Sequence, residues 1–259
     1  MSGPALLELF AGIGGLSLGL ERAGFVVAGQ VEIDPFCRSV LATHWPEVPR
    51  HDDVRTAPAW WRSQPRPPLD LLAGGFPCQP FSTAGRRRGV ADARWMWPAM
   101  ADTIRELAPR YVLVENVAAL LRDRTAFGWL LGDLADLGFD AEWSLLSACA
   151  VGAPHVRSRV FVVAYPMREL GPLGLADPPR LQPAGGQPVR PGPDRAGPWR
   201  DPVDGLMAAE RRSHRMADGV PDPLEPARVR ALGNAVVPQV AEHIGRMIHN
   251  HMTTQGGSA

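Results

Sequence analysis

Apolar residues in the first third of the chain form short continuous runs that alternate with stretches of helical spacing. Residues 5–10 are an apolar run that ends in a glycine-rich turn, and residues 16–23 follow with helical spacing. A second strand is predicted at 25–31, a second helix at 34–44 and a third strand at 69–73. This order of elements is typical of an α/β protein with parallel strands.

The same alternation continues to about residue 165. Helices are predicted at 97–107 and 127–137, a buried strand at 111–114, and a hairpin from 141–148 and 159–165. The pattern predicts a mostly parallel sheet with helices on both faces and an antiparallel edge.

A change of composition marks the end of this main domain, 1–165. Residues 171–202 contain nine Pro and six Gly, so we expect the segment 166–227 to be irregular. Regular spacing returns in 228–249, which includes an amphipathic final helix, and a short tail is expected at 250–259. Length and pattern therefore predict one main domain with a small appendage.

Charge and cysteine content narrow the class of protein. All 27 basic residues are Arg and balance 27 acidic residues, so any surface for nucleic acid must be local. Cys37, Cys78 and Cys149 show no CxxC spacing, which argues against a disulfide framework or a zinc site, and we expect no metal. Without a leader or a long apolar run, we expect a cytoplasmic protein with no membrane segment.

A glycine-rich loop and an acid twenty residues later indicate a nucleotide-like cofactor. The loop FAGIGG follows a predicted strand and opens a helix, where backbone N–H groups can approach a ligand closely. Glu32 ends the second predicted strand, where a carboxylate can accept hydrogen bonds from ribose hydroxyls. The pair favours a dinucleotide or S-adenosylmethionine, and the alternative is a tight turn beside an exposed acid.

Polar residues gather at the ends of the following strands. Cys78 stands between two prolines in GGFPCQPFS, where the third parallel strand leaves the sheet. A lone cysteine is more often a buried apolar residue than a nucleophile, so the surrounding motif must decide between these two roles. Glu115 follows the strand at 111–114, and Arg157 and Arg159 enter the last strand with a spacing that places both on one side. The alternatives are an ordinary acid at a strand end for Glu115 and solvated surface residues for the two arginines.

Four motifs in this order resemble the C5-cytosine methyltransferase family: FAGIGG, GGFPCQPFS, Glu115-Asn116-Val117 and GNAVVP at 233–238. The resemblance covers residue 6 to about 165 and about 228 to 245. It implies a Rossmann-like S-adenosylmethionine-dependent methyltransferase fold, with 1–165 as the catalytic and cofactor-binding domain. The segment 166–227 is then a small, irregular target-recognition segment, and 228–249 returns to the catalytic domain. The implied reaction is methyl transfer to carbon 5 of cytosine in double-stranded DNA.

The resemblance also implies roles for individual residues. The family adds a thiolate to carbon 6 of cytosine, and Cys78 would supply it, while Glu115 would stabilise charge at the ring N3. Arg157 and Arg159 would orient the glutamate and the base. The expected cofactor contacts are Phe10, Gly12, Gly14, Gly15, Leu16, Glu32, Ile33, Asp53, Val54, Asn234 and Val236. Because Asp52 is adjacent to Asp53, that assignment is open by one residue.

DNA contacts are expected after the nucleophile and near the C-terminus. A basic run flanked by glycines can clamp phosphates while the target base is extruded from the duplex, although a solvated charge run is the alternative. The expected contacts are Gln79, Ser82, Arg86, Arg87, Arg88, Arg211, Arg212 and Arg215. The short recognition segment predicts a short target or an accessory recognition chain. We further expect a monomer, with a cognate restriction endonuclease as a further partner.

Departures from the family and competing functions remain open. His155 stands where the family usually has glutamine, and Trp95 and Trp97 are not the usual neighbours of the Asp92-x-Arg94 element. A tRNA cytosine-5 methyltransferase would share the chemistry, and a catalytically inactive DNA-binding relative would explain the missing recognition elements. The presence of Cys78, Glu115 and Arg159 counts against the inactive relative. A nicotinamide-dependent oxidoreductase fits only the glycine-rich loop.

Overall fold

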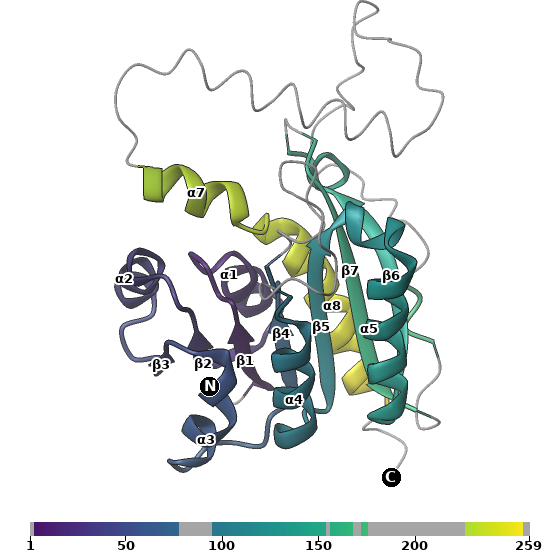
Figure 1. Ribbon diagram of the computed structural model, residues 1–259, viewed down its shortest axis with the longest axis horizontal. Coiled ribbons are helices and arrows are strands. Elements are labelled where there is room, and N and C mark those ends of the chain that lie inside the picture. Colours follow the sequence, from purple (N-terminus) through teal and green to yellow (C-terminus); the bar gives the residue numbers. More distant parts are fainter. Residues whose placement is uncertain (1–2, 78–94, 154–155, 168–171, 176–225, 256–259) are drawn as a thin grey trace, which may run out of the picture.

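A seven-stranded sheet organises the part of the chain that the computed structural model describes, residues 3–77, 95–153, 156–167, 172–175 and 226–255 (Figure 1). Its order is β3-β2-β1-β4-β5-β7-β6. The strands are β1 (Ala5–Leu9), β2 (Val26–Val31), β3 (Arg50–His51), β4 (Leu71–Gly74), β5 (Tyr111–Val117), β6 (Phe139–Ser147) and β7 (Ser158–Pro166). The first five are parallel, and β7 pairs antiparallel with both β5 and β6. The expected α/β fold with a mostly parallel sheet and an antiparallel edge is therefore confirmed.

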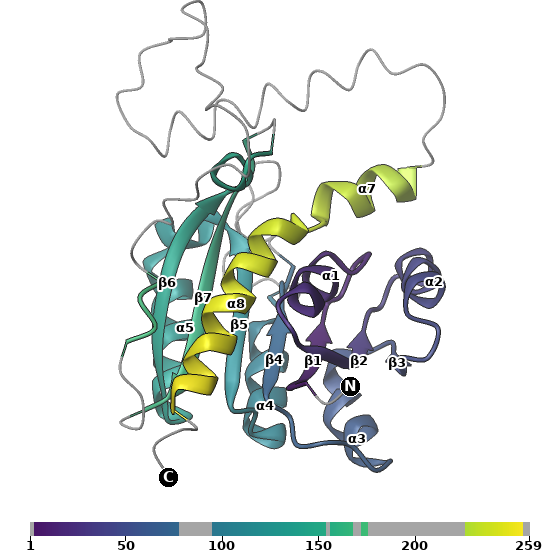
Figure 2. The same cartoon turned by 180° about the vertical axis from the view of Figure 1, so that it is seen from behind.

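Helices cover both faces of this sheet, as the two opposite views show (Figures 1 and 2). One face carries α1 (Gly15–Arg22) and α8 (Pro238–Gln255), and the other carries α3 (Ala57–Arg62), α4 (Trp97–Leu107) and α5 (Arg124–Asp136). The helices α2 (Pro35–His44) and α7 (Pro226–Asn234) flank the edge at which the parallel strands end. Short 3₁₀ turns lie at η1 (Val54–Thr56), η3 (Ala118–Arg122) and η4 (Ala148–Val151).

The central strands feed two hydrophobic cores, one on each face. Successive side chains of a strand point to opposite faces, so Leu6 packs beneath α1 and α8 while Leu7 packs beneath α3, α4 and α5. The same alternation separates Leu71 from Leu72. Strands buried on both faces read as continuous apolar runs, which explains why the sequence predicted them well.

The C-terminal helix returns to the first helix of the chain through glycine contacts. A Cβ on Gly19 would lie 2.3 Å from the Pro238 carbonyl oxygen, and a Cβ on Gly245 would lie 2.7 Å from the Cβ of Ala23. Only glycine allows this close approach of α1 and α8. Because Met252 is still buried, α8 continues to Gln255, past the boundary at 249 that the sequence suggested.

Several elements differ from the prediction for local reasons. The two-residue β3 and the short α3 carry too few apolar positions to give a periodic signal. β5 continues through Val117, so Glu115 lies within the strand and not after it. α5 begins at Arg124 because the carboxylate of Asp123 accepts a hydrogen bond from the Ala126 N–H, 3.0 Å away. None of the helices described is both long and apolar enough to cross a membrane.

Candidate active site

A cavity of about 260 Å³ opens at the edge where the parallel strands end. Its walls come from the ends of β1, β2, β4 and β5, from β7, and from α7, which crosses this edge. Ligands of open α/β sheets bind at this edge. The expected site residues that line it are Phe10, Gly12, Gly15, Leu16, Glu32, Ile33, Glu115, Arg159, Asn234 and Val236.

The glycine-rich loop forms one wall of the cavity through unusual backbone conformations. Phe10 and Gly12 have φ values of 55° and 54°, and Phe10 is one of few side-chain-bearing residues described with a positive φ. A Cβ on Gly15 would lie 2.3 Å from the Val236 carbonyl oxygen. Gly15 therefore lets Val236, in the loop between α7 and α8, pack directly against the start of α1.

Gly14 has a different function from its neighbours because it does not line the cavity. Its φ is 85°, and a Cβ there would lie 2.4 Å from the indole of Trp45. Gly14 thus allows the turn and the packing of α1 against the end of α2.

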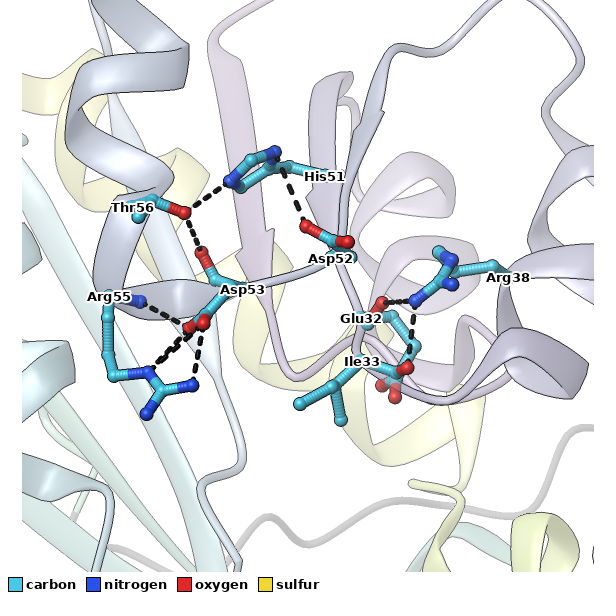
Figure 3. A network of polar contacts seen from close by, with 8 residues as sticks. All are labelled: Glu32, Ile33, Arg38, His51, Asp52, Asp53, Arg55 and Thr56. Carbon is cyan, nitrogen blue, oxygen red and sulfur yellow. Dashed lines mark hydrogen bonds and ion pairs between the residues drawn. The ribbon is translucent and has the colours of Figure 1, made fainter.

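Glu32 is fixed at the end of β2 by backbone donors. Its carboxylate accepts hydrogen bonds from the N–H groups of Gly12 and Asp34, both 2.7 Å away. One guanidinium nitrogen of Arg38 donates to the carbonyl oxygens of Glu32 and Ile33, both at 2.8 Å (Figure 3). These contacts hold the turn after β2, and they present an Ile33 side chain that is 69% exposed. The result is a fixed carboxylate beside an apolar rim.

Glu8 is a buried cavity residue that the sequence reasoning missed. It lies in the middle of β1 and is 1% exposed, and its carboxylate accepts hydrogen bonds from the N–H and the hydroxyl group of Ser17. Ser17 in turn accepts from the side-chain amide of Gln30 at 3.0 Å. Burial raises the pKa of Glu8 to about 8, and the hydrogen bonds from Ser17 oppose this shift only in part. A charged residue within the apolar run ALLELF was the available signal.

Glu115 and Arg159 meet on the opposite wall. Glu115 pairs with Phe161 across the antiparallel ladder, and Arg159 lies two residues before Phe161, so both side chains point to the same face. The guanidinium Nε of Arg159 lies 3.1 Å from a Glu115 carboxylate oxygen, and both side chains are about nine-tenths buried. Burial raises the pKa of Glu115, and the charges of Arg159 and Arg157 counter that rise only partly.

The segment after β4 is shaped around Glu115. A Cβ on Gly75 would lie 2.5 Å from a carboxylate oxygen of Glu115, so a larger residue at this position would displace that carboxylate. The Asn116 side-chain amide donates to the Phe76 carbonyl oxygen at 3.0 Å. Gly75, Phe76 and Pro77 all line the cavity. The chain enters the Pro-Cys-Gln motif along this wall.

Some expected site residues lie elsewhere. Asp53 accepts hydrogen bonds from the backbone N–H and the guanidinium of Arg55, which lower its pKa to about 2 (Figure 3). Val54 is buried in the core beneath α3 and α4, and neither residue lines the cavity. Arg157 precedes β7 and also lies outside the lining, although its charge acts on Glu115.

Other expected residues lie outside the described part of the chain. They are Cys78, Gln79, Ser82, Arg86, Arg87, Arg88, His155, Arg211, Arg212 and Arg215.

Additional lining residues come from helices that the sequence did not connect to the site. Asp34 and Cys37 lie at the start of α2, and Arg230 and Ala231 lie on α7. Burial raises the pKa of Cys37 to about 11, so its thiol stays protonated at neutral pH. Nothing in the sequence distinguished Arg230 from other arginines, because its place depends on how α7 crosses the sheet edge.

Comparisons with known proteins agree with this geometry. The sequence model of a family described as "C-5 cytosine-specific DNA methylase" matches residues 5–171. The type II methyltransferase M.NgoMIV of Neisseria gonorrhoeae is 37% identical over 161 residues, which are 61% of this chain and 50% of that protein. For M.HgiCII of Herpetosiphon aurantiacus the identity is 33% over 66% of this chain and 38% of that protein. The chain thus spans half or less of the length of these relatives.

Solved structures share the fold. A DNA modification methyltransferase encoded within an E. coli prophage aligns with a TM-score of 0.68 and 21% identity, over 96% of this chain and 99% of that one. A Spodoptera frugiperda DNMT2 variant aligns with a TM-score of 0.53 and 24% identity, over 64% of this chain and 50% of that one. At these identities the likeness concerns the fold alone.

Proposed function

The chain belongs to the C-5 cytosine-specific DNA methylase family, and we propose that it transfers a methyl group from S-adenosylmethionine to carbon 5 of cytosine in double-stranded DNA. The observation that carries the proposal is the buried pair of Glu115 and Arg159, which faces the same cavity as Glu32. Glu32 would accept hydrogen bonds from hydroxyl groups, and Glu115 would hold a proton beside the guanidinium of Arg159.

The cavity fits S-adenosylmethionine at three points. Glu32 offers a fixed carboxylate to the ribose hydroxyls, and Asn234 and Val236 close the wall beside Gly15. Glu8 is a buried acid on the same cavity whose carboxylate accepts hydrogen bonds from Ser17, which suits a ligand that carries positive charge. When bound, the cofactor supplies an electrophilic methyl group on its sulfonium.

The residues of the chain would activate the cytosine ring. The Cys78 thiolate attacks carbon 6 and forms a covalent S–C bond, which makes carbon 5 nucleophilic. Glu115 carries the proton that it shares with the ring N3 as negative charge develops there. Arg159 holds the Glu115 carboxyl in one orientation from 3.1 Å. Once carbon 5 carries the methyl group, loss of its proton to solvent would break the S–C bond and return the thiolate.

We infer the partners of this chain from the names of its relatives. The relatives are named type II methyltransferases, so we propose a cognate type II restriction endonuclease that recognises the same DNA sequence. The chain would act as a monomer on duplex DNA. Its recognition segment, 166–227, would read a short target, with Arg211, Arg212 and Arg215 among the contacts.

Cytosine-methylation sequencing tests this function. The chain is expressed in a host that lacks cytosine methylation, and the Cys78→Ala variant is expressed in parallel. We expect 5-methylcytosine at one motif of about two to four base pairs with the wild type and none with the variant. Unmethylated host DNA, together with labelled methyl groups on tRNA, would contradict the proposal. A strict motif of six or more base pairs would contradict the short target alone.

A further inference from the structure

Three aromatic rings join the end of β4 to the start of α4. The rings of Phe76 and Trp95 meet edge to face, with centroids 5.1 Å apart and planes at 86°. Trp97 lies 5.8 Å from Phe76 on a tilted plane. Its indole N–H donates to Asp133 of α5 at 2.7 Å. All three rings are buried, so residues 76 and 95 lie side by side although the segment 78–94 separates them in sequence.

The same Phe76 is held from the other side by the wall that carries Glu115. Asn116 donates to the Phe76 carbonyl oxygen, and the Glu115 carboxylate fills the space beside Gly75. Phe76 is thus held between β5 and the ring of Trp95, and Gly75 packs against Glu115. Any displacement of Phe76 toward Trp95 would lengthen the Asn116 hydrogen bond and open the contact of Gly75 with Glu115.

We propose that Trp95 is a positioning residue that acts through Phe76 to hold the segment 75–77 against Glu115. This inference rests on the proposed function, because that function makes Cys78, the residue after the segment 75–77, the nucleophile. Holding Gly75 and Phe76 in one position lowers the entropy cost of bringing the groups of this wall to one geometry. An edge-to-face ring pair supplies an orientation as well as apolar burial, which a branched aliphatic side chain cannot replace.

The test compares Trp95→Leu, Trp95→Phe and Trp61→Leu in the full chain. Trp61 is a matched control because it is equally buried in the same hydrophobic core but contacts Trp60 and Arg66. We expect Trp95→Leu to lower kcat at least about tenfold with the S-adenosylmethionine Kd changed less than about threefold. Trp95→Phe restores a ring and should keep kcat within about threefold of the wild type. Trp61→Leu should lower the melting temperature while leaving kcat nearly unchanged.

Hydrogen exchange gives a readout that does not depend on turnover. We expect the Phe76 amide to exchange at least about tenfold faster in Trp95→Leu than in Trp61→Leu. Equal exchange in both variants, or an equal loss of kcat in both, would overturn the proposal. If the wild type methylates no DNA, the proposed function fails, while the exchange rates still decide the role of Trp95.

Phe76→Leu is a second test variant, and it replaces Trp95→Leu if that variant does not fold. It removes the other ring, so faster exchange of the 75–76 amides is again expected. In a folded double variant the second substitution should change kcat by less than about twofold, because both residues act through one contact. Effects that multiply independently would contradict action of Trp95 through Phe76.

Discussion

The two ends of the cavity hold their carboxylates in opposite ways. At the parallel end, the Glu32 carboxylate accepts two backbone N–H groups, and Arg38 donates to the carbonyl oxygens of Glu32 and Ile33. At the antiparallel end, Glu115 is buried beside the Arg159 guanidinium. The first arrangement fixes a hydrogen-bond acceptor, and the second raises the pKa of an acid and fixes its direction. Under the proposed function, one fold would thus separate a carboxylate that binds the cofactor from a carboxylate that acts as the acid.

This difference follows from strand direction. Parallel strands end together at one edge, so Glu32 meets the N–H groups of neighbouring loops. The antiparallel β7 brings Arg159 back along β5 and places it on the same face as Glu115. The reversed direction of β7 is therefore what supplies a buried cation at the site.

The largest expected effect comes from removing the acid at the antiparallel end. Glu115→Gln keeps the size of the side chain but cannot exchange the proton, so kcat should fall at least about a hundredfold. Single-turnover transfer of a labelled methyl group to duplex DNA measures it. Cofactor affinity, measured by calorimetry, should change little. Equal losses of kcat and of cofactor affinity would erase the distinction between the two ends.

A smaller effect is expected from Glu8, which lies between the two ends. Its folded-state pKa of about 8 exceeds its ordinary value of 4.5, so its contribution to stability is full below about pH 4.5 and is lost as the pH rises toward 8. Glu8→Gln should therefore be more stable than the wild type by at least about 2 kcal/mol at pH 8, and by much less at pH 5. Denaturant unfolding at several pH values measures the difference. A difference that stays constant with pH would show that Glu8 does not titrate as inferred.

The smallest of these effects is expected from a change of Glu32. Glu32→Ala should weaken S-adenosylmethionine binding at least about tenfold, because it removes hydrogen bonds to a charged acceptor. With saturating cofactor, kcat should stay within about threefold of the wild type. Glu47→Ala is the matched control, because Glu47 is an exposed acid between α2 and β3. This variant should change neither quantity. A lower kcat at saturating cofactor would place Glu32 in the chemistry instead.

The sequence anticipated the parts of the site that lie at strand ends. FAGIGG, Glu32 and Glu115 each close or follow an apolar run, and the topology then brings them together. Arg230 was not anticipated because its position depends on the path of α7 far along the chain. Glu8 was missed because it occupies one place in an otherwise apolar strand. Asp53 was expected at the cavity, but it does not line it. Its carboxylate is bound instead by the guanidinium of Arg55, two residues later.

The boundaries of the elements were less predictable than their existence. Short elements such as β3 leave no periodic signal, and capping by Asp123 extends α5 toward the N-terminus. Such local contacts compete with periodicity at every helix end. The two cores, in contrast, followed directly from continuous apolar strands.

Covalent trapping on a duplex that contains 5-fluorocytosine at the methylated motif tests the central claim most directly. Fluorine cannot leave carbon 5 as a proton does, so the S–C bond to the enzyme persists after methyl transfer. We expect a denaturant-resistant complex with the wild type whose mass equals enzyme, DNA and one methyl group, with Cys78 as the attachment site. The Cys78→Ala variant should give none. A wild type that methylates the unmodified duplex yet forms no adduct, or an adduct on another residue, would contradict the mechanism.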